Sequence, residues 1–107
     1  MPFLELRQYV IRPGKIDEWV KFFDEVILPF QISRGMSVVG SFRGEVDESV
    51  FIWIRRFDSE AERERLYAAV YEDPEWKDEI APRVGDLMDR ALIKVQRITP
   101  TPVSALK

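Results

Sequence analysis

The sequence predicts an α+β domain with the element order β-α-β-β-α-β, the ferredoxin-like arrangement of a four-stranded antiparallel sheet covered by helices on one face. Two observations predict it. Each half of the chain combines strand-like alternation with a helical segment, and a short polar turn joins the two middle strands. With 107 residues, of which 46% are hydrophobic and 33% charged, the chain fits one globular domain over residues 1–107.

The first half predicts a strand and then an amphipathic helix. Residues 3–12 alternate in polarity, and Pro13-Gly14 ends the strand by removing a donor and permitting an unusual backbone angle. Pro29 predicts a kink or an end of the helix, with an irregular turn over 29–34. The apolar positions at helical spacing are Ile16, Trp19, Val20, Phe23, Ile27 and Phe30.

The second half predicts a hairpin, a helical region and a last strand. Strands over 36–46 and 49–57 flank the turn Asp47-Glu48. Ser59 and Glu62 have the spacing of a capping box, which predicts a helix start there. Asp73-Pro74 indicates a second start, so this helical region is broken in two. The final strand is predicted over 91–98, and the proline-containing tail over about 99–107 is expected to be extended or loosely held.

Alternation along the strands divides the side chains of the sheet into two sets. We expect the aliphatic set to face the helices and the aromatic and charged set to form an open face. A face with Phe51, Trp53 and Phe57 is too apolar to remain in water. We therefore predict a homodimer packed sheet against sheet, with a mixed cavity enclosed between the sheets. The aromatic and charged set is Glu5, Arg7, Tyr9, Ile11, Phe51, Trp53, Arg55 and Phe57; the aliphatic set is Leu4, Leu6, Val10, Val50, Ile52 and Ile54.

The absence of histidine and cysteine excludes many chemistries. A Ser-His-Asp triad, a cysteine nucleophile, an ordinary structural zinc site and a histidine-ligated haem are all excluded. We predict no cofactor and no metal. The net charge of −3 argues against nucleic acid and membrane partners. No apolar run approaches the roughly 20 residues that span a bilayer, and a cytoplasmic location is the simplest inference.

An ordered set of motifs resembles the NIPSNAP family. They are ELRQY at 5–9, Pro13-Gly14, GMSVVGSF at 35–42, IWIRRF at 52–57 and Asp73-Pro74-Glu75-Trp76. The resemblance spans nearly the whole domain and implies the dimeric α/β barrel superfamily, in which two ferredoxin-like subunits pack sheet against sheet. It implies no single activity. Related barrels include cofactor-independent monooxygenases, lactone isomerases and haem enzymes, and the lack of histidine argues against the last group.

Five residues of the aromatic and charged set are the candidates for a site. Glu5 and Tyr9 are candidates for proton transfer. Arg7, Trp53 and Arg55 are candidates for binding a small anionic or enolic molecule, because a guanidinium beside an aromatic ring suits such a ligand. For each there is a structural alternative, an ion pair for the charged residues and packing for the aromatic ones.

Other polar and aromatic residues favour structural roles. Trp19 and Trp76 are expected to pack, and Arg63 to be solvated or paired with a neighbouring glutamate. Tyr67 and Tyr71, four residues apart on one helix, either pack or reach one end of the cavity.

Three functions remain open. The first is a small-molecule enzyme or binding protein that uses the barrel cavity. The second is a non-catalytic dimeric scaffold, which predicts a filled barrel without a pocket. The third and least favoured is RNA binding through sheet aromatics, because the topology is shared with RNA-recognition domains.

Overall fold

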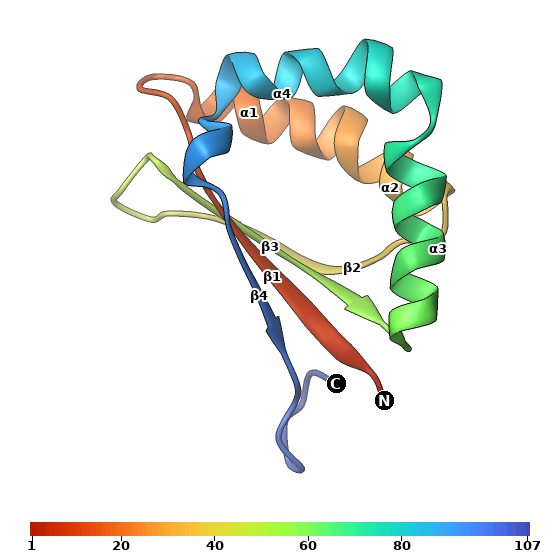
Figure 1. Cartoon of the computed structure of the whole chain (residues 1–107). Coiled ribbons are helices and arrows are strands. Elements are labelled where there is room, and N and C mark those ends of the chain that lie inside the picture. Colours follow the sequence, from red (N-terminus) through yellow and green to blue (C-terminus); the bar gives the residue numbers. More distant parts are fainter.

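A computed structural model of the whole chain, residues 1–107, shows one four-stranded antiparallel sheet with the helices on one face (Figure 1). The strands lie in the order β2-β3-β1-β4. This confirms the predicted ferredoxin-like arrangement, with each strand somewhat shorter than its predicted range. The strands are β1 (Phe3–Val10), β2 (Ser37–Arg43), β3 (Val50–Phe57) and β4 (Lys94–Ile98).

Each helical connection is built from consecutive segments. The first comprises α1 (Ile16–Phe22), η1 (Phe23–Ile27) and α2 (Leu28–Ser33), and the second comprises α3 (Glu60–Tyr71), η2 (Glu75–Ile80) and α4 (Ala81–Leu87). A short 3-10 turn, η3 (Arg90–Leu92), leads into β4. The backbone N–H of Glu62 donates to the Ser59 hydroxyl at 3.1 Å, which confirms the predicted start of α3.

The segments η1 and η2 are π-helical. Each leads directly into an α-helix whose second residue is a proline, Pro29 in α2 and Pro82 in α4. A proline donates no N–H, and its ring collides with the carbonyl four residues earlier. The residue before Pro29 and the residue before Pro82 donate instead to the carbonyl five residues back. The sequence predicts a kink or an end at Pro29, but the widened turn accommodates the ring and the helix continues to Ser33.

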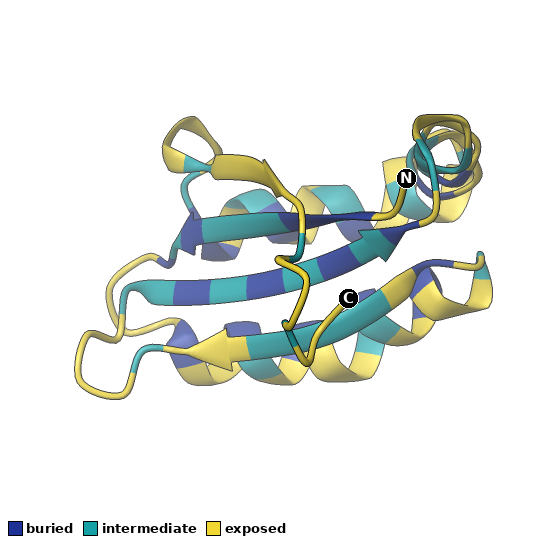
Figure 2. Ribbon diagram, turned by 90° about the horizontal axis from the view of Figure 1, so that it is seen from below, coloured by how far each residue is buried: buried dark blue, intermediate teal, exposed yellow.

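The two residue sets of the sheet are as predicted, but the set that faces the helices is the opposite one. In β3 the aromatic and charged residues are buried and the aliphatic residues between them are half-buried, an alternation visible in Figure 2. Glu5 lies opposite Arg55 and Tyr9 opposite Phe51 in the antiparallel register, and all four are buried. The expectation that this set forms the open face is therefore wrong.

Two physical terms explain the reversal. Aromatic side chains bury the largest apolar area, so Phe51, Trp53 and Phe57 gain more from the helix-covered face than valine and isoleucine do. The same face also takes Glu5 and Arg55, whose burial would be costly if either charge were alone. That cost falls when two charges neutralise each other and hydrogen-bond to nearby polar groups, as they do here.

The open face of the sheet is aliphatic, and the C-terminal tail crosses part of it (Figure 2). Tail residues between Thr99 and Leu106 line a shallow hollow with Leu4, Ile54 and Ile98. Arg56 Nε donates to the carbonyl of Lys107 at 2.8 Å. The tail expected to be extended or loosely held is therefore folded back over the sheet. None of the helices has the length and apolar character that spanning a bilayer requires.

Candidate functional site

The sheet face beneath the helices holds a buried ion pair between its two central strands. Arg55 is fully buried and Glu5 is 2% exposed. Arg55 Nε and Nη2 donate to Glu5 Oε1 at 3.1 and 2.5 Å. Because burying either charge alone costs several kcal/mol, about 3–5 kcal/mol when one partner of such a pair is removed, each group depends on the other.

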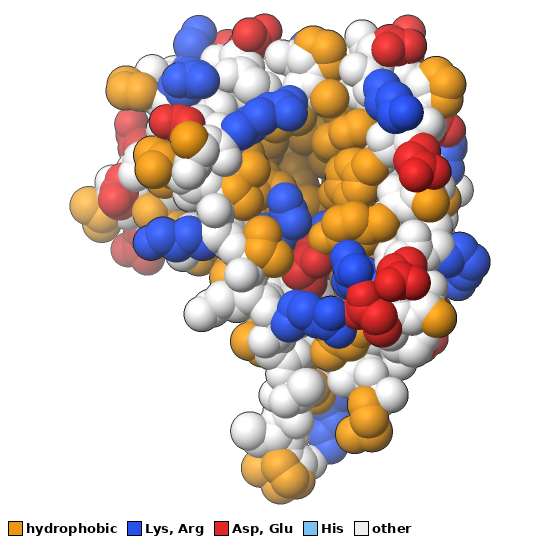
Figure 3. All heavy atoms as spheres, in the orientation of Figure 1, with side chains coloured by type: hydrophobic (Ala, Val, Ile, Leu, Met, Phe, Trp, Pro, Cys, Tyr) orange, Lys and Arg blue, Asp and Glu red, His pale blue; other side chains and the backbone are white.

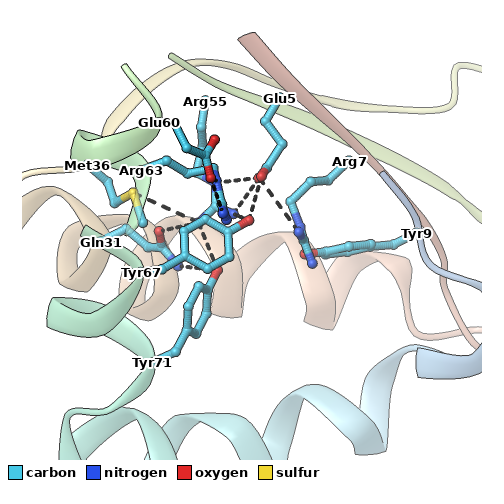
Figure 4. A network of polar contacts seen from close by, with 10 residues as sticks. All are labelled: Glu5, Arg7, Tyr9, Gln31, Met36, Arg55, Glu60, Arg63, Tyr67 and Tyr71. Carbon is cyan, nitrogen blue, oxygen red and sulfur yellow. Dashed lines mark hydrogen bonds and ion pairs between the residues drawn. The ribbon is translucent and has the colours of Figure 1, made fainter. Parts of the chain in front are cut away.

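Three polar side chains from the helices complete the surroundings of Arg55 (Figure 4). Its Nη1 donates to Gln31 Oε1 at 3.0 Å and to the Tyr71 hydroxyl at 2.7 Å, and its Nη2 donates to the Tyr67 hydroxyl at 2.9 Å. A guanidinium has five N–H donors. With the two contacts to Glu5 every donor has an acceptor, so Arg55 has none left for a ligand.

Glu5 is equally well paired. The Tyr67 hydroxyl donates to its second carboxylate oxygen at 2.5 Å. Burial acts to raise the pKa of Glu5, but the charge of Arg55, the Tyr67 hydrogen bond and the charge of Arg7 outweigh it and hold that pKa below its usual range. Burial raises the pKa of Tyr67 to about 12. At neutral pH the carboxylate is therefore ionised and the phenol neutral.

Arg7, two residues along β1, has far fewer partners. Its Nε donates to the Tyr9 hydroxyl at 2.9 Å, and its Nη1 lies 3.6 Å from Glu5 Oε1, an ion pair without a hydrogen bond. No protein group accepts a hydrogen bond from its two terminal nitrogens. Two guanidiniums thus share one carboxylate, which leaves this part of the interior with a net charge of about +1.

Arg7 and Tyr9 lie beside a cavity of about 210 Å³ between the sheet and the helices. Figure 3 shows it as a hollow surrounded by hydrophobic side chains, with basic side chains at its edge. All three tryptophans of the chain line it. The aromatic lining residues are Tyr9, Trp19, Phe23, Trp53, Tyr71 and Trp76.

Both π-helical segments contribute to the wall of the cavity. Phe23 and Ile27 come from η1 and Trp76 from η2. The Trp76 ring packs edge-on against Tyr71 with 5.0 Å between centroids. A π turn changes the direction in which side chains leave a helix and is frequent at functional sites. The proline-induced turns therefore help to place the aromatic lining.

Two buried donors in the lining have no hydrogen-bond partner. They are the indole N–H groups of Trp19 and Trp53. The Trp53 indole is close enough to the Tyr9 hydroxyl to act on its pKa but lacks hydrogen-bond geometry. Burial raises the pKa of Tyr9 in spite of Arg7 and Trp53, so its hydroxyl keeps its proton. An unpaired buried donor costs about 1–3 kcal/mol, which an acceptor on a ligand would recover.

The structure separates the five predicted site residues into two groups. Arg7, Tyr9 and Trp53 line the cavity, whereas Glu5 and Arg55 lie behind it and bind each other. The roles predicted for these residues stay predictions, but the pairing of Glu5 and Arg55 favours the structural alternative for both. This cavity lies within the chain, between the sheet and the helices, and a cavity between two sheets stays a prediction.

Several residues of the site lie outside that prediction. Gln31 is fully buried, and its signal in the sequence is a polar residue four positions after Ile27 on an otherwise apolar helix face. Tyr71 does reach the cavity, while Tyr67 does not line it. Trp19 and Trp76 pack as expected and also line the cavity. Arg63 pairs with Glu60 at 2.6 Å, as expected.

The structure gathers no group of three or more acidic side chains that could hold a metal ion. No curated protein matches the sequence significantly. The model of the NIPSNAP family matches residues 4–105.

Solved structures resemble the whole chain. A NIPSNAP family protein from Agrobacterium tumefaciens is 25% identical over 100% of both chains, with a TM-score of 0.89. An uncharacterized NIPSNAP-like domain protein from Burkholderia xenovorans is 19% identical over 96% of this chain and 88% of its own, with a TM-score of 0.85. A putative antibiotic biosynthesis monooxygenase from Bacteroides thetaiotaomicron shares the fold at 17% identity, over 99% and 94% of the chains, with a TM-score of 0.63.

Proposed function

Because the chain belongs to the NIPSNAP family, and a structurally similar member is described as having unknown function, we propose a function from the site itself. This protein binds a small, largely apolar molecule in the cavity between its sheet and its helices. The observation that carries the proposal is a cavity of about 210 Å³ with six aromatic side chains in its lining. A dry cavity of about 150 Å³ already admits benzene in another protein. One or two fused rings therefore fit the volume.

Catalysis without a cofactor is the finer form of the proposal. Tyr9 lines the cavity and keeps its proton, so it can donate one to a bound ligand. Glu5 is the predicted partner in proton transfer, but its carboxylate is already held by Arg55 and Tyr67. The arrangement therefore supports binding more strongly than turnover. The fold shared with a putative monooxygenase is consistent with either.

The two other functions have less support. A pure scaffold predicts a barrel without a pocket, and the cavity between the sheet and the helices favours a binding function over it. RNA binding requires exposed aromatic rings on the central strands, but Phe51 and Trp53 are buried under the helices. The only aromatic ring exposed on the open face is that of Phe42, on the edge strand β2.

We keep the homodimer and the cytoplasmic location as proposals. The aliphatic open face, with half-buried Leu6, Ile52 and Ile54, supports a second copy packed sheet against sheet. Sedimentation tests this: a stable monomer at micromolar concentration would contradict the dimer.

Tryptophan fluorescence tests the binding proposal, because every tryptophan of the chain lines the cavity. We expect a one-ring aromatic probe to change the fluorescence saturably. Val84→Phe, which fills the cavity from α4, should abolish the change, whereas Val46→Phe in an exposed loop should not. Absence of saturable binding, or binding that Val84→Phe leaves unchanged, would contradict the proposal.

A further inference from the structure

The polar side-chain groups around the cavity are nearly all hydrogen-bond donors. Arg7 and Arg90 can only donate, and so can the indole N–H groups of the lining tryptophans. No aspartate or glutamate is among the lining residues. The hydroxyls of Tyr9 and Tyr71 can donate or accept a hydrogen bond, so their present partners decide which role is left for a ligand.

The buried network around Arg55 leaves the Tyr71 hydroxyl free to donate a hydrogen bond but not to accept one. Its oxygen accepts from Arg55 Nη1 at 2.7 Å and from Gln31 Nε2 at 3.4 Å (Figure 4). A hydroxyl has two acceptor lone pairs and one proton. Both acceptor positions are used, and no protein group accepts the proton, so Tyr71 is left as a donor. Its neighbour Tyr67 differs, because its proton goes to Glu5.

The Tyr9 hydroxyl is likewise available as a hydrogen-bond donor. Its oxygen accepts from Arg7 Nε at 2.9 Å, no protein group accepts its proton, and burial raises its pKa, so it remains a donor at neutral pH. The one carboxylate nearby, Glu5, is shared between Arg55 and Arg7. The cavity therefore has donors without acceptors beside a net positive charge of about one, in a protein whose overall charge is −3.

We propose that the ligand of this cavity is an aromatic oxyanion, a carboxylate or a phenolate on a planar ring, held by Arg7 and by the hydroxyl of Tyr71. This rests on the proposed binding function. The ring packs among the aromatic lining, and the oxyanion supplies the acceptors and the negative charge that the wall lacks. An ammonium group would find no side-chain acceptor and would lie beside a net positive charge, so the site selects against it in spite of its aromatic rings.

Matched one-ring probes separate the classes. Isothermal titration would compare benzoate and 4-nitrophenolate, as carboxylate and phenolate, with benzyl alcohol and benzylammonium of similar size. We expect the oxyanions to bind at least about tenfold more tightly than the alcohol, as hydrogen bonds to charged groups imply, and the ammonium not to bind. The ratio of the affinities for benzoate and 4-nitrophenolate shows whether the site prefers a carboxylate or a phenolate.

Variants then assign the contacts. Arg7→Met should weaken binding of benzoate by about tenfold or more, and Tyr71→Phe by about three- to tenfold, without changing the affinity for benzyl alcohol to the same extent. Tyr67→Phe removes the same hydroxyl one turn earlier, outside the cavity lining, and should leave benzoate affinity near that of the wild type. Arg65→Met, exposed on α3, controls for the loss of a positive charge. Circular dichroism checks that each variant folds.

The outcomes are distinguishable. If no probe binds, the proposed binding function fails and this inference fails with it. If benzyl alcohol or benzylammonium binds as tightly as the oxyanions, the cavity binds ligands but the oxyanion inference is wrong. If Tyr67→Phe weakens benzoate binding as much as a folded Tyr71→Phe does, the assigned role of Tyr71 is wrong.

Discussion

Two arginines on neighbouring strands of one sheet face, Arg55 and Arg7, have opposite surroundings. Arg55 is fully buried, and all five of its N–H donors have acceptors. Arg7 donates one hydrogen bond, to Tyr9, and lies beside a cavity. Burial and residue type alone would favour Arg55 as the functional residue. The number of unused donors indicates Arg7 instead.

The difference shows how a buried charge can be assigned to structure or to function. A saturated guanidinium stabilises the fold through its partners and offers a ligand nothing. An unsaturated guanidinium beside a cavity keeps N–H donors that a ligand with acceptor atoms can use. The same distinction applies to the tyrosines, since Tyr67 gives its proton to Glu5 while the proton of Tyr71 has no protein acceptor.

The largest effect should come from Arg55→Met. The substitution leaves the Glu5 carboxylate buried with only Arg7 and Tyr67 near it, and breaking a buried pair costs about 3–5 kcal/mol of unfolding free energy. Urea unfolding measures this loss, with Arg65→Met as the control on the surface of α3. A loss below about 1 kcal/mol would mean that the network contributes little to stability.

Glu5→Gln should produce a smaller and pH-dependent loss. The pKa of Glu5 is lowered in the folded protein, so its charge stabilises the fold above the unfolded pKa of about 4.3, and that contribution disappears as the pH falls through the folded pKa. The wild type should therefore exceed the variant in stability by about 1.5–3 kcal/mol at neutral pH, and the difference should shrink below about pH 4.

Urea unfolding across a pH series measures that difference, with Glu25→Gln on the exposed side of η1 as the control. A difference that stays constant from neutral to acidic pH would show that the charge of Glu5 is not responsible.

Arg7→Met sharpens the comparison, because the same substitution should have little effect on stability. It removes a cation that shares its only carboxylate with Arg55, and the methionine side chain can pack against the aromatic lining. We expect the unfolding free energy to change by less than about 1 kcal/mol. A loss as large as that of Arg55→Met would show that both arginines belong to one structural network.

The smallest effect should come from a surface pair. Arg43 Nη1 lies 2.9 Å from the carboxylate of Asp17, whose side chain is 89% exposed. Solvent screens such pairs, so Asp17→Asn should produce no measurable change in the urea midpoint. A clear loss would indicate that geometry alone, without burial, accounts for the stability of the ion pairs in this protein.

Most of the fold could be predicted from the sequence because strand alternation, capping residues and turn residues are local signals. The helix start at Ser59 and the order of the elements along the chain are examples. The orientation of the sheet could not, because alternation shows only which residues share a face. Which face meets the helices depends on tertiary terms, the burial of the aromatic side chains and the pairing of Glu5 with Arg55, two residues fifty positions apart.

Part of the candidate site could also be predicted, because alternation along a strand shows which side chains share a face. Arg7, Tyr9 and Trp53 share a strand face by parity and do line one cavity. The hydrogen bonds from Arg55 to Gln31, Tyr67 and Tyr71 could not be predicted, because they depend on where the helices pack on the sheet. The widened turns before Pro29 and Pro82 also escape residue-level patterns, because a proline within a helical pattern is compatible with a kink, an end or a π turn.

A crystal structure of the protein with 1-naphthoate would distinguish the two arginines best. We expect the rings among Trp19, Trp53 and Trp76, with the carboxylate oxygens within hydrogen-bond distance of Arg7 and the hydroxyl of Tyr71, and with the Glu5–Arg55 pair unchanged. An empty cavity at saturating 1-naphthoate, a carboxylate directed away from Arg7, or a carboxylate that displaces Glu5 from Arg55 would contradict the division into a structural and a ligand-binding arginine.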